Sequence, residues 1–452
     1  MVAPDLVIRS TRVVAGTGAP APASIHVAGG RIVAIAGYAD VPAGCPIDDA
    51  GDAVVSPGLV DTHVHVNEPG RAAWEGFAAA TRAAAAGGVT TIVDMPLNSI
   101  PPTTTADALA SKRAAAAGQC WVDVGLWGGV VPGNLDDLEP LARGGVLGYK
   151  CFLVPSGVDE FPHVGDADLR PALARLRDLG RPLLVHAEHP DAIAAAAGAL
   201  RGDARRYATY LASRPPEAED RAVDLMIRLA RDTGAAVHIV HHASAGSLDA
   251  LSRARDDGLA VTAETCPHYL RFCAEAIPDG ATAFKCAPPI REAHHRERLW
   301  EALAAGVLDM VVTDHSPCTP DLKRRGSGSF ADAWGGIASL QLGLAVTWTE
   351  ARRRGFGVER LAQWLSVAPA RLAGLSARKG RIAVGCDADL VVWDPDVAWT
   401  VDATRLHHRN PVTPYDGDTL HGAVRTTYLR GVAIYRDGRH CGKPAGQLLA
   451  AS

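Results

Sequence analysis

The sequence predicts an α/β fold in which a (β/α)8 TIM barrel carries a small β-sandwich domain formed by both termini. Two patterns lead to this prediction. Between residues 55 and 315, short runs rich in β-branched residues alternate with Ala-, Leu- and Arg-rich stretches of helical length. This alternation is typical of parallel strands joined by helical crossovers. Outside this region, both ends of the chain have the pattern of short strands and hairpins.

Eight candidate strands follow one another in the alternating region. They are residues 54–66, 88–96, 119–127, 145–154, 181–188, 235–244, 259–270 and 308–317. Helical stretches separate them, as in residues 205–234 between the fifth and the sixth strand. Eight parallel strands with interposed helices favour a closed barrel, and an open doubly wound sheet is the alternative.

The two ends of the chain have a different pattern from the middle. Residues 1–55 contain "ASIHVAGGRIVAIAG", in which Gly29 and Gly30 mark a hairpin turn. Residues 378–437 repeat this style, so we expect the termini to meet in one β-sandwich beside the barrel. The expected division is therefore 1–55, 56–377 and 378–452, the last with a C-terminal tail.

The composition is that of an ordinary globular protein with a small-molecule partner. The 452 residues carry a formal net charge of -5, which offers no basic stripe for nucleic acid and no polybasic patch for a membrane surface. No segment has the length and apolar character of a membrane span, and the N-terminus shows no secretory signal. Nine scattered cysteines without a C-x-x-C pair indicate reduced thiols, so we expect a cytoplasmic protein.

Side chains that can bind metals stand at the ends of five predicted strands. They are His63, His65, Lys150, His186, His241, His242 and Asp314. Barrels of this kind carry their chemistry at the carboxyl ends of the strands, and imidazole and carboxylate are ligands for Zn²⁺, Fe²⁺, Co²⁺ or Mn²⁺. Any one of these residues alone would more often be structural, but their joint placement predicts a metal site.

Lys150 is the unusual member of the set. An ammonium group would be repelled by two dications, whereas a lysine amine that has reacted with CO₂ becomes a carbamate with two oxygens. Each oxygen could bind one metal, so a carboxylated Lys150 would supply the bridging anion that four neutral imidazoles and one carboxylate lack. Two residues away from His63 on the same strand face, Asp61 is a candidate to orient that ligand, with a plain buried hydrogen bond as the alternative.

The motifs in this order resemble the cyclic amidohydrolases of the amidohydrolase superfamily, and most closely the allantoinase family. The resemblance spans nearly the whole chain. It rests on "DTHVHVNEPG", "WEGF", "AAAAGGVTTIVDMPLNSIPPT", "GYKCFLVPSGVDEFPHV", "LLVHAE", "ETCPHYL", "KCAPPIR", "TDHSPC", "WGGI" and "GCDADLVVWDP".

The resemblance implies a centre with two divalent metal ions, with Zn²⁺ expected first and Co²⁺, Mn²⁺ or Fe²⁺ as alternatives. His63 and His65 would bind one metal and His186 and His241 the other. Lys150, carboxylated on its side-chain nitrogen, would bridge them, and Asp314 would bind a metal and move the proton. An ungapped fit of "HIVHHASA" places the ligand at His241, although strand alternation alone does not decide between His241 and His242.

The implied reaction is hydrolysis of the cyclic amide of allantoin to allantoate, a step of purine catabolism. A metal-bridged hydroxide would attack the amide carbonyl, with Asp314 as general base and then general acid. Asn98 and Ser156 are candidate substrate contacts, although such residues in Gly- and Pro-rich loops are usually turn formers. The family also implies a homo-oligomer, commonly a tetramer. The polar, Gly-rich segment 318–336 is a candidate mobile lid over this site.

Related activities are the competing interpretations. A dihydroorotase is expected to carry an arginine where this chain has Asn67, and a hydantoinase or dihydropyrimidinase a tyrosine where it has Pro155. A catalytically dead scaffold would have lost metal ligands. A mononuclear deaminase of the same superfamily would not need Lys150.

Overall fold

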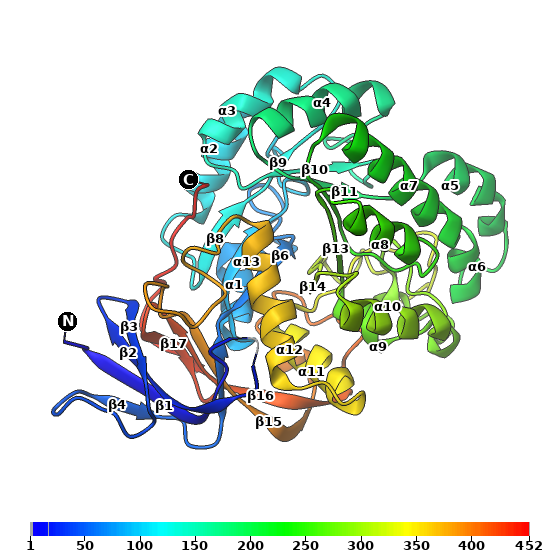
Figure 1. The fold of residues 1–452 in the computed structure, drawn as a ribbon. Coiled ribbons are helices and arrows are strands. Elements are labelled where there is room, and N and C mark those ends of the chain that lie inside the picture. Colours follow the sequence, from blue (N-terminus) through cyan, green and yellow to red (C-terminus); the bar gives the residue numbers. More distant parts are fainter. Residues whose placement is uncertain (1–2, 17, 452) are drawn as a thin grey trace.

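The computed structural model describes residues 3–16 and 18–451, and a barrel of parallel strands forms its centre (Figure 1). Each of the eight predicted strands contributes a parallel strand to this barrel, which confirms the predicted fold class. The barrel strands are β6 (Leu59–Val64), β7 (Val89–Asp94), β8 (Asp123–Leu126), β9 (Gly128–Gly129), β10 (Tyr149–Phe152), β11 (Leu183–His186), β12 (Val237–Ile239), β13 (Val261–Thr265) and β14 (Met310–Val311).

The barrel closes through two seams. Among the described residues, β6, β7 and β8 form one parallel sheet and β9 to β14 another. Trp127 alone separates β8 from β9, so one chain segment belongs to both sheets. At the other seam, Val64 and His315 form a parallel bridge that joins β6 to the segment after β14. The carboxyl ends of all these strands therefore meet at one face of the barrel.

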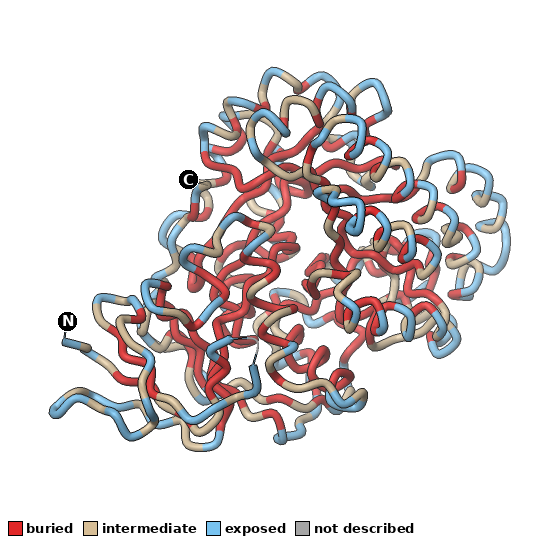
Figure 2. The backbone as a smooth tube through the Cα atoms, viewed as in Figure 1, coloured by how far each residue is buried: buried red, intermediate tan, exposed pale blue. Residues whose placement is uncertain are grey.

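Helices cover the outside of the barrel, and their inner faces are buried while their outer faces are exposed (Figure 2). The longest, α7 (Pro216–Thr233), begins with a proline, where the missing N–H costs nothing, and ends at Gly234 with φ of 70°. Over the described residues, every helix is too short or too polar to cross a bilayer. The other helices are α1 (Phe77–Ala86), α2 (Ala106–Ala116), α3 (Leu138–Arg143), α4 (Asp166–Asp178), α5 (Pro190–Ala196), α6 (Tyr207–Ala212), α8 (Leu248–Asp256), α9 (Pro267–Arg271), α10 (Ala293–Ala305), α11 (Gly343–Arg353), α12 (Val358–Ala362) and α13 (Ala368–Leu372).

Both ends of the chain contribute to a second sheet beside the barrel. In the described part of the chain this sheet has nine strands in the order β18-β17-β16-β15-β5-β1-β2-β3, with β4 paired to β1. It has its own hydrophobic cluster, which includes Ile8, Ile25 and Val392. The strands are β1 (Leu6–Val13), β2 (Ala21–Ala28), β3 (Arg31–Ala36), β4 (Ile47–Asp49), β5 (Val54–Pro57), β15 (Leu390–Thr400), β16 (Thr419–Leu429), β17 (Val432–Arg436) and β18 (Arg439–His440).

The first predicted barrel strand, residues 54–66, is two strands in the structure. Its first part, β5, pairs with β1 and β15 in the terminal sheet, and only β6 enters the barrel. The break falls at Gly58, where a Cβ atom would lie 2.4 Å from the Thr90 side chain. The close approach of the Thr90 side chain therefore requires glycine at this position, between two strands that the sequence predicts as one.

A buried ion cluster joins the barrel to the terminal sheet. The Lys379 ammonium lies 2.5 Å from an oxygen of Asp123, 3.0 Å from one of Asp387 and 2.6 Å from one of Asp389. Asp123 begins β8, and Asp389 directly precedes β15. Three converging carboxylates could hold a cation, and here the lysine itself occupies their centre.

Replacing Lys379 with methionine is expected to lower the free energy of unfolding by about 3–5 kcal/mol, because it leaves buried carboxylates without their cation. Urea denaturation followed by circular dichroism measures this loss. The matched control is Lys443→Met at an exposed position, for which a change within about 0.5 kcal/mol is expected. Equal stability of the two variants would contradict a stabilising role for the cluster.

Candidate metal centre

The carboxyl ends of the barrel strands open into a cavity of about 420 Å³. This volume is in the range of small-molecule sites. All of the metal ligands expected from the resemblance and both candidate substrate contacts line it, namely His63, His65, Asn98, Lys150, Ser156, His186, His241 and Asp314. Residues from strands far apart in the sequence are thus brought to one cavity by closure of the barrel.

Three of these residues converge in the first half of the site. His63 Nε2 lies 3.2 Å and His65 Nε2 3.5 Å from Asp314 Oδ1, and the ligand atoms of the three lie within 4.8 Å of one another. On its other side, His63 Nδ1 lies 2.5 Å from Glu264 Oε1. A carboxylate there holds the proton on Nδ1 and leaves the Nε2 lone pair directed at the cluster.

The second half of the site contains His186 and His241. His186 Nδ1 lies 2.9 Å from His241 Nε2, and the His241 ring is 5.3 Å from that of His63. Two nitrogens bound to one tetrahedral Zn²⁺ lie about 3.3 Å apart, so this pair fits a common cation. Burial lowers the pKa of both histidines, which keeps the imidazoles neutral and their lone pairs free for a metal.

Lys150 lies in β10, fully buried. Its Nζ has no hydrogen-bond partner among the described residues, and burial lowers the pKa of the amine to about 8. Lys150 lines the same cavity as His65, His186 and His241, and its positive charge helps to lower the pKa of these three histidines. A buried ammonium without a partner is costly, so this position fits an amine that is modified and bound to cations.

The backbone is strained at two of the predicted ligands. His241 has φ of 38° and Asp314 has φ of 43°, both in the left-handed region that residues other than glycine rarely adopt. Such strain persists only where the surrounding structure enforces it, and it is concentrated at functional sites. Here, it turns two side chains into the cavity where a regular strand would continue.

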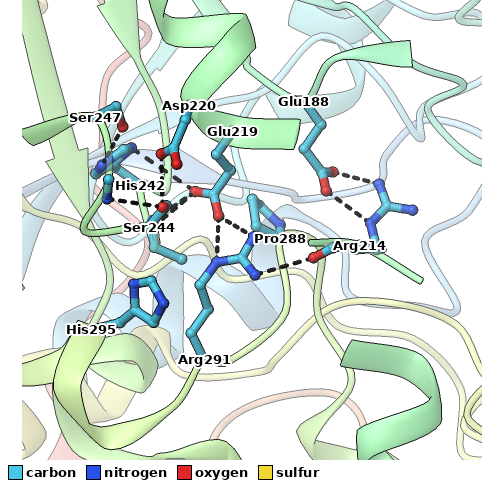
Figure 3. A network of polar contacts seen from close by, with 12 residues as sticks. Glu188, Arg214, Glu219, Asp220, His242, Ser244, Ser247, Pro288, Arg291 and His295 are labelled. Carbon is cyan, nitrogen blue, oxygen red and sulfur yellow. Dashed lines mark hydrogen bonds and ion pairs between the residues drawn. The ribbon is translucent and has the colours of Figure 1, made fainter. Parts of the chain in front are cut away.

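His241 and the neighbouring His242 point in different directions. His241 faces the cavity, whereas His242 Nε2 lies 3.3 Å from Ser247 Oγ and its Nδ1 lies 3.9 Å from a Glu219 oxygen (Figure 3). His242 therefore belongs to a polar network outside the cavity. The positive φ of His241 explains why strand alternation did not decide between the two.

Asn98 and Ser156 differ in what their side chains are free to do. The Asn98 side-chain amide lies 3.4 Å from His65 Nδ1, and its buried Oδ1 has no partner among the described residues. The Ser156 hydroxyl donates a hydrogen bond to the Phe161 carbonyl oxygen at 2.6 Å, within its own loop. Asn98 thus offers polar atoms to the cavity, while the Ser156 hydroxyl is already used.

Asp61 does not contact the His63 ring. Its carboxylate accepts hydrogen bonds from the backbone N–H groups of His63 at 3.1 Å and Thr313 at 3.2 Å, and from the Thr313 hydroxyl at 2.6 Å. It therefore connects the backbones of two strand ends, which agrees with the buried hydrogen bond given as the alternative. Glu264 supports the ring instead, a role that the motif "ETCPHYL" does not by itself indicate.

Hydrogen bonds from two lysine side chains hold segment 318–336, the predicted lid, at the cavity. The buried Lys323 ammonium donates to the carbonyl oxygens of Lys285 at 3.2 Å and Trp334 at 3.0 Å. Lys285 in turn donates to the Ala333 carbonyl oxygen at 2.6 Å. Trp334 and its neighbours line the cavity, so the segment forms a fixed wall in this structure. The Gly- and Ser-rich composition that suggested mobility did not reveal these contacts.

The chain is similar to known proteins over nearly its full length. Residues 54–434 match the model of the amidohydrolase family. An allantoinase of Streptomyces avermitilis is 53% identical over 99% of this chain and 98% of its own, and an allantoinase of Arabidopsis thaliana is 44% identical over 98% and 91%. The solved structure of L-hydantoinase (dihydropyrimidinase) from Arthrobacter aurescens superposes with a TM-score of 0.93 at 30% identity, covering 99% of this chain and all of that one. The chain therefore belongs to the amidohydrolase family and, within it, to the allantoinases.

Proposed function

We propose that the protein hydrolyses the cyclic amide bond of allantoin to give allantoate, in a metal-dependent reaction. The observation that carries this proposal is the convergence of four histidines, a buried lysine and an aspartate on one cavity, in a chain 53% identical to an allantoinase. A catalytically dead scaffold is disfavoured because every ligand expected from the family is present. Lys150 supports a binuclear site, because a mononuclear site would leave this lysine without a role.

The ligands divide into two sets in this proposal. His63 and His65 would hold one divalent cation, and His186 and His241 would hold the other. A carboxylated Lys150 would hold both cations, which is supported by its burial, its unpartnered Nζ among the described residues and its place in the same cavity as both histidine pairs. Asp314 completes the first set, since its Oδ1 faces the Nε2 atoms of both histidines there. We take Zn²⁺ as the first candidate for both cations.

Bound at this site, two such cations would lower the pKa of a water molecule and polarise the amide carbonyl. Asp314 accepts the proton of the attacking water and transfers it to the amide nitrogen as the ring opens. The Ser316 hydroxyl donates to Asp314 Oδ1 at 2.7 Å and orients the carboxylate for this transfer. Asn98, which lines the cavity beside His65, offers hydrogen bonds to the polar edge of the ring.

An uncharged ring fits this cavity better than a carboxylated one. Asn67 stands where a dihydroorotase is expected to carry an arginine, and Pro155 stands where a hydantoinase is expected to carry a tyrosine. The arginine in the cavity wall, Arg214, already has a carboxylate partner in Glu188. The substrate of choice is therefore the neutral hydantoin ring of allantoin.

Steady-state rates on allantoin, hydantoin, dihydrouracil and dihydroorotate test the proposal. We expect kcat/KM for allantoin to exceed that for each of the others. Faster turnover of hydantoin or dihydrouracil would instead assign the protein to the hydantoinases. Metal analysis of the same sample is expected to find two divalent ions per chain.

Four further properties are proposed with the function. We place the protein in purine catabolism in the cytoplasm and expect a homotetramer. We also divide the chain into 1–55, 56–377 and 378–452, which is supported by the terminal sheet and its separate hydrophobic cluster. Within the last part, residues after β18 return to the barrel, where Leu448 bridges Val124 of β8.

The adjacent histidines offer a matched pair of variants. His241→Ala is expected to remove one metal ion and to lower kcat by about 10²-fold or more, because the ligand is lost. His242→Ala is expected to keep both ions and most of the activity, since its ring lies outside the cavity. Metal analysis with steady-state kinetics on both variants checks this, and the reverse pattern would move the ligand to His242.

A further inference from the structure

Glu188 and Arg214 stand directly behind one of the two metal positions. Glu188 is fully buried, and its Oε2 lies 2.6 Å from His186 Nε2 (Figure 3 shows the Glu188–Arg214 pair). Arg214 Nε donates to Glu188 Oε1 at 2.9 Å, and its Nη2 donates to Oε2. The guanidinium thus holds both carboxylate oxygens, while its side chain lines the cavity.

This arrangement fixes which nitrogen of His186 can bind a metal. A carboxylate at Nε2 requires the ring proton there, so the lone pair is on Nδ1, the atom that faces His241. The two-point contact with Arg214 prevents the carboxylate plane from rotating away from the ring. His186 is therefore held both in tautomer and in orientation.

A second ion pair continues the network towards His241. Arg291 donates to the Arg214 carbonyl oxygen at 3.1 Å and, through Nε, to Glu219 Oε1 at 2.7 Å (Figure 3). The other oxygen of Glu219 accepts the backbone N–H of Ala243 at 2.9 Å, two residues after His241. One connected set of contacts therefore reaches the ring of His186 and the strained backbone next to His241.

The other metal position is supported by different residues. His63 is held by Glu264, and the His65 N–H donates to the His315 carbonyl oxygen at 2.8 Å. Glu264 also accepts the His241 N–H at 3.2 Å, so it touches both halves, whereas the contacts of Glu188 and Arg214 reach only the His186 side. Loss of Glu188 or Arg214 should therefore weaken metal binding at the His186–His241 position only.

We propose that Glu188 and Arg214 are positioning residues that build one of the two metal positions, so that without them the His186–His241 position loses its cation while the His63–His65–Asp314 position keeps its own. This inference rests on the proposed binuclear centre. It adds the contacts through which one metal position can be lost while the other is kept. Partners behind a metal-binding histidine typically change metal affinity by about 10–100-fold.

The test compares Glu188→Gln with Arg214→Lys in the full-length protein. After dialysis against a chelator, the wild type is expected to retain two ions per chain, and Glu188→Gln about one, as expected for about 10–100-fold weaker binding at one position. Arg214→Lys keeps the charge but not the two-point contact, and an intermediate affinity is expected. Metal content is measured by mass spectrometry, and zinc affinity by competition with a chromophoric chelator.

Asp220→Asn is the matched control. Asp220 is the neighbour of Glu219 on α7 and contacts the Ser244 hydroxyl at 2.8 Å, away from His186. We expect this variant to keep two ions with unchanged affinity. Unfolding of the metal-free proteins by urea separates a loss of stability from a loss of metal. If Glu188→Gln does not fold, the metal content and zinc affinity of the milder Arg214→Lys variant test the proposal.

The outcomes separate this inference from the proposed function. Two ions held with wild-type affinity in both variants would overturn the positioning role and leave the proposed function intact. Equal weakening of both ions would also overturn it, because the two positions would not be separable. A wild-type protein that binds fewer than two ions would instead refute the binuclear centre itself. A kcat that falls with KM unchanged in Arg214→Lys is the expected kinetic result.

Discussion

Lys150→Ala is expected to lose bound metal and to lower kcat/KM for allantoin by about 10⁴-fold. The reason is the loss of the bridging anion, since metal polarisation contributes several kcal/mol to such reactions and each 1.4 kcal/mol is tenfold in rate. Metal analysis and steady-state kinetics measure the two effects. Wild-type activity in Lys150→Ala would favour a mononuclear site and contradict the proposed centre.

Two further variants separate lost chemistry from lost folding. Lys150→Arg keeps a cation but cannot form the same carbamate, and we expect it to be as inactive as the alanine variant. Lys150→Met fills a similar volume without a polar atom. Because Nζ is buried without a described partner, the metal-free methionine variant should be at least as stable to urea as the metal-free wild type. Added bicarbonate is expected to promote metal uptake by the wild type only.

Asp314→Asn is expected to lower kcat for allantoin by about 10²–10⁴-fold, with a much smaller change in KM. The amide keeps the shape of the side chain and its contact with Ser316 but cannot accept the proton of the attacking water. Steady-state kinetics on matched, metal-analysed samples measures this effect. A kcat within tenfold of wild type, with both metals bound, would remove Asp314 from the proton transfer.

The control for this variant is Ser316→Ala. The hydroxyl orients Asp314 without taking the proton, so its removal should lower kcat by about tenfold, the effect of one hydrogen bond to a charged group. A loss in Ser316→Ala as large as in Asp314→Asn would mean that orientation, and not proton transfer, explains the aspartate effect.

The alternation of strands and helices predicted the barrel because each element shows its pattern within its own residues. The period of two within a strand indicated that His63 and His65 face one side, and the barrel face was set by chain direction alone. The same local pattern predicted β5 and β6 as one strand. Within residues 54–66, only Gly58 marks the point where the chain passes from the terminal sheet into the barrel.

By itself, the sequence determined the fold class, the family and the group of side chains at the strand ends, because these depend on local period, order and residue type. The tertiary structure decided which side chains support them. Arg214, Glu264 and Lys323 act on residues distant in the chain, and His241 faces the cavity through a left-handed backbone. Such contacts arise only when the barrel closes, so no pattern within a single element could predict them.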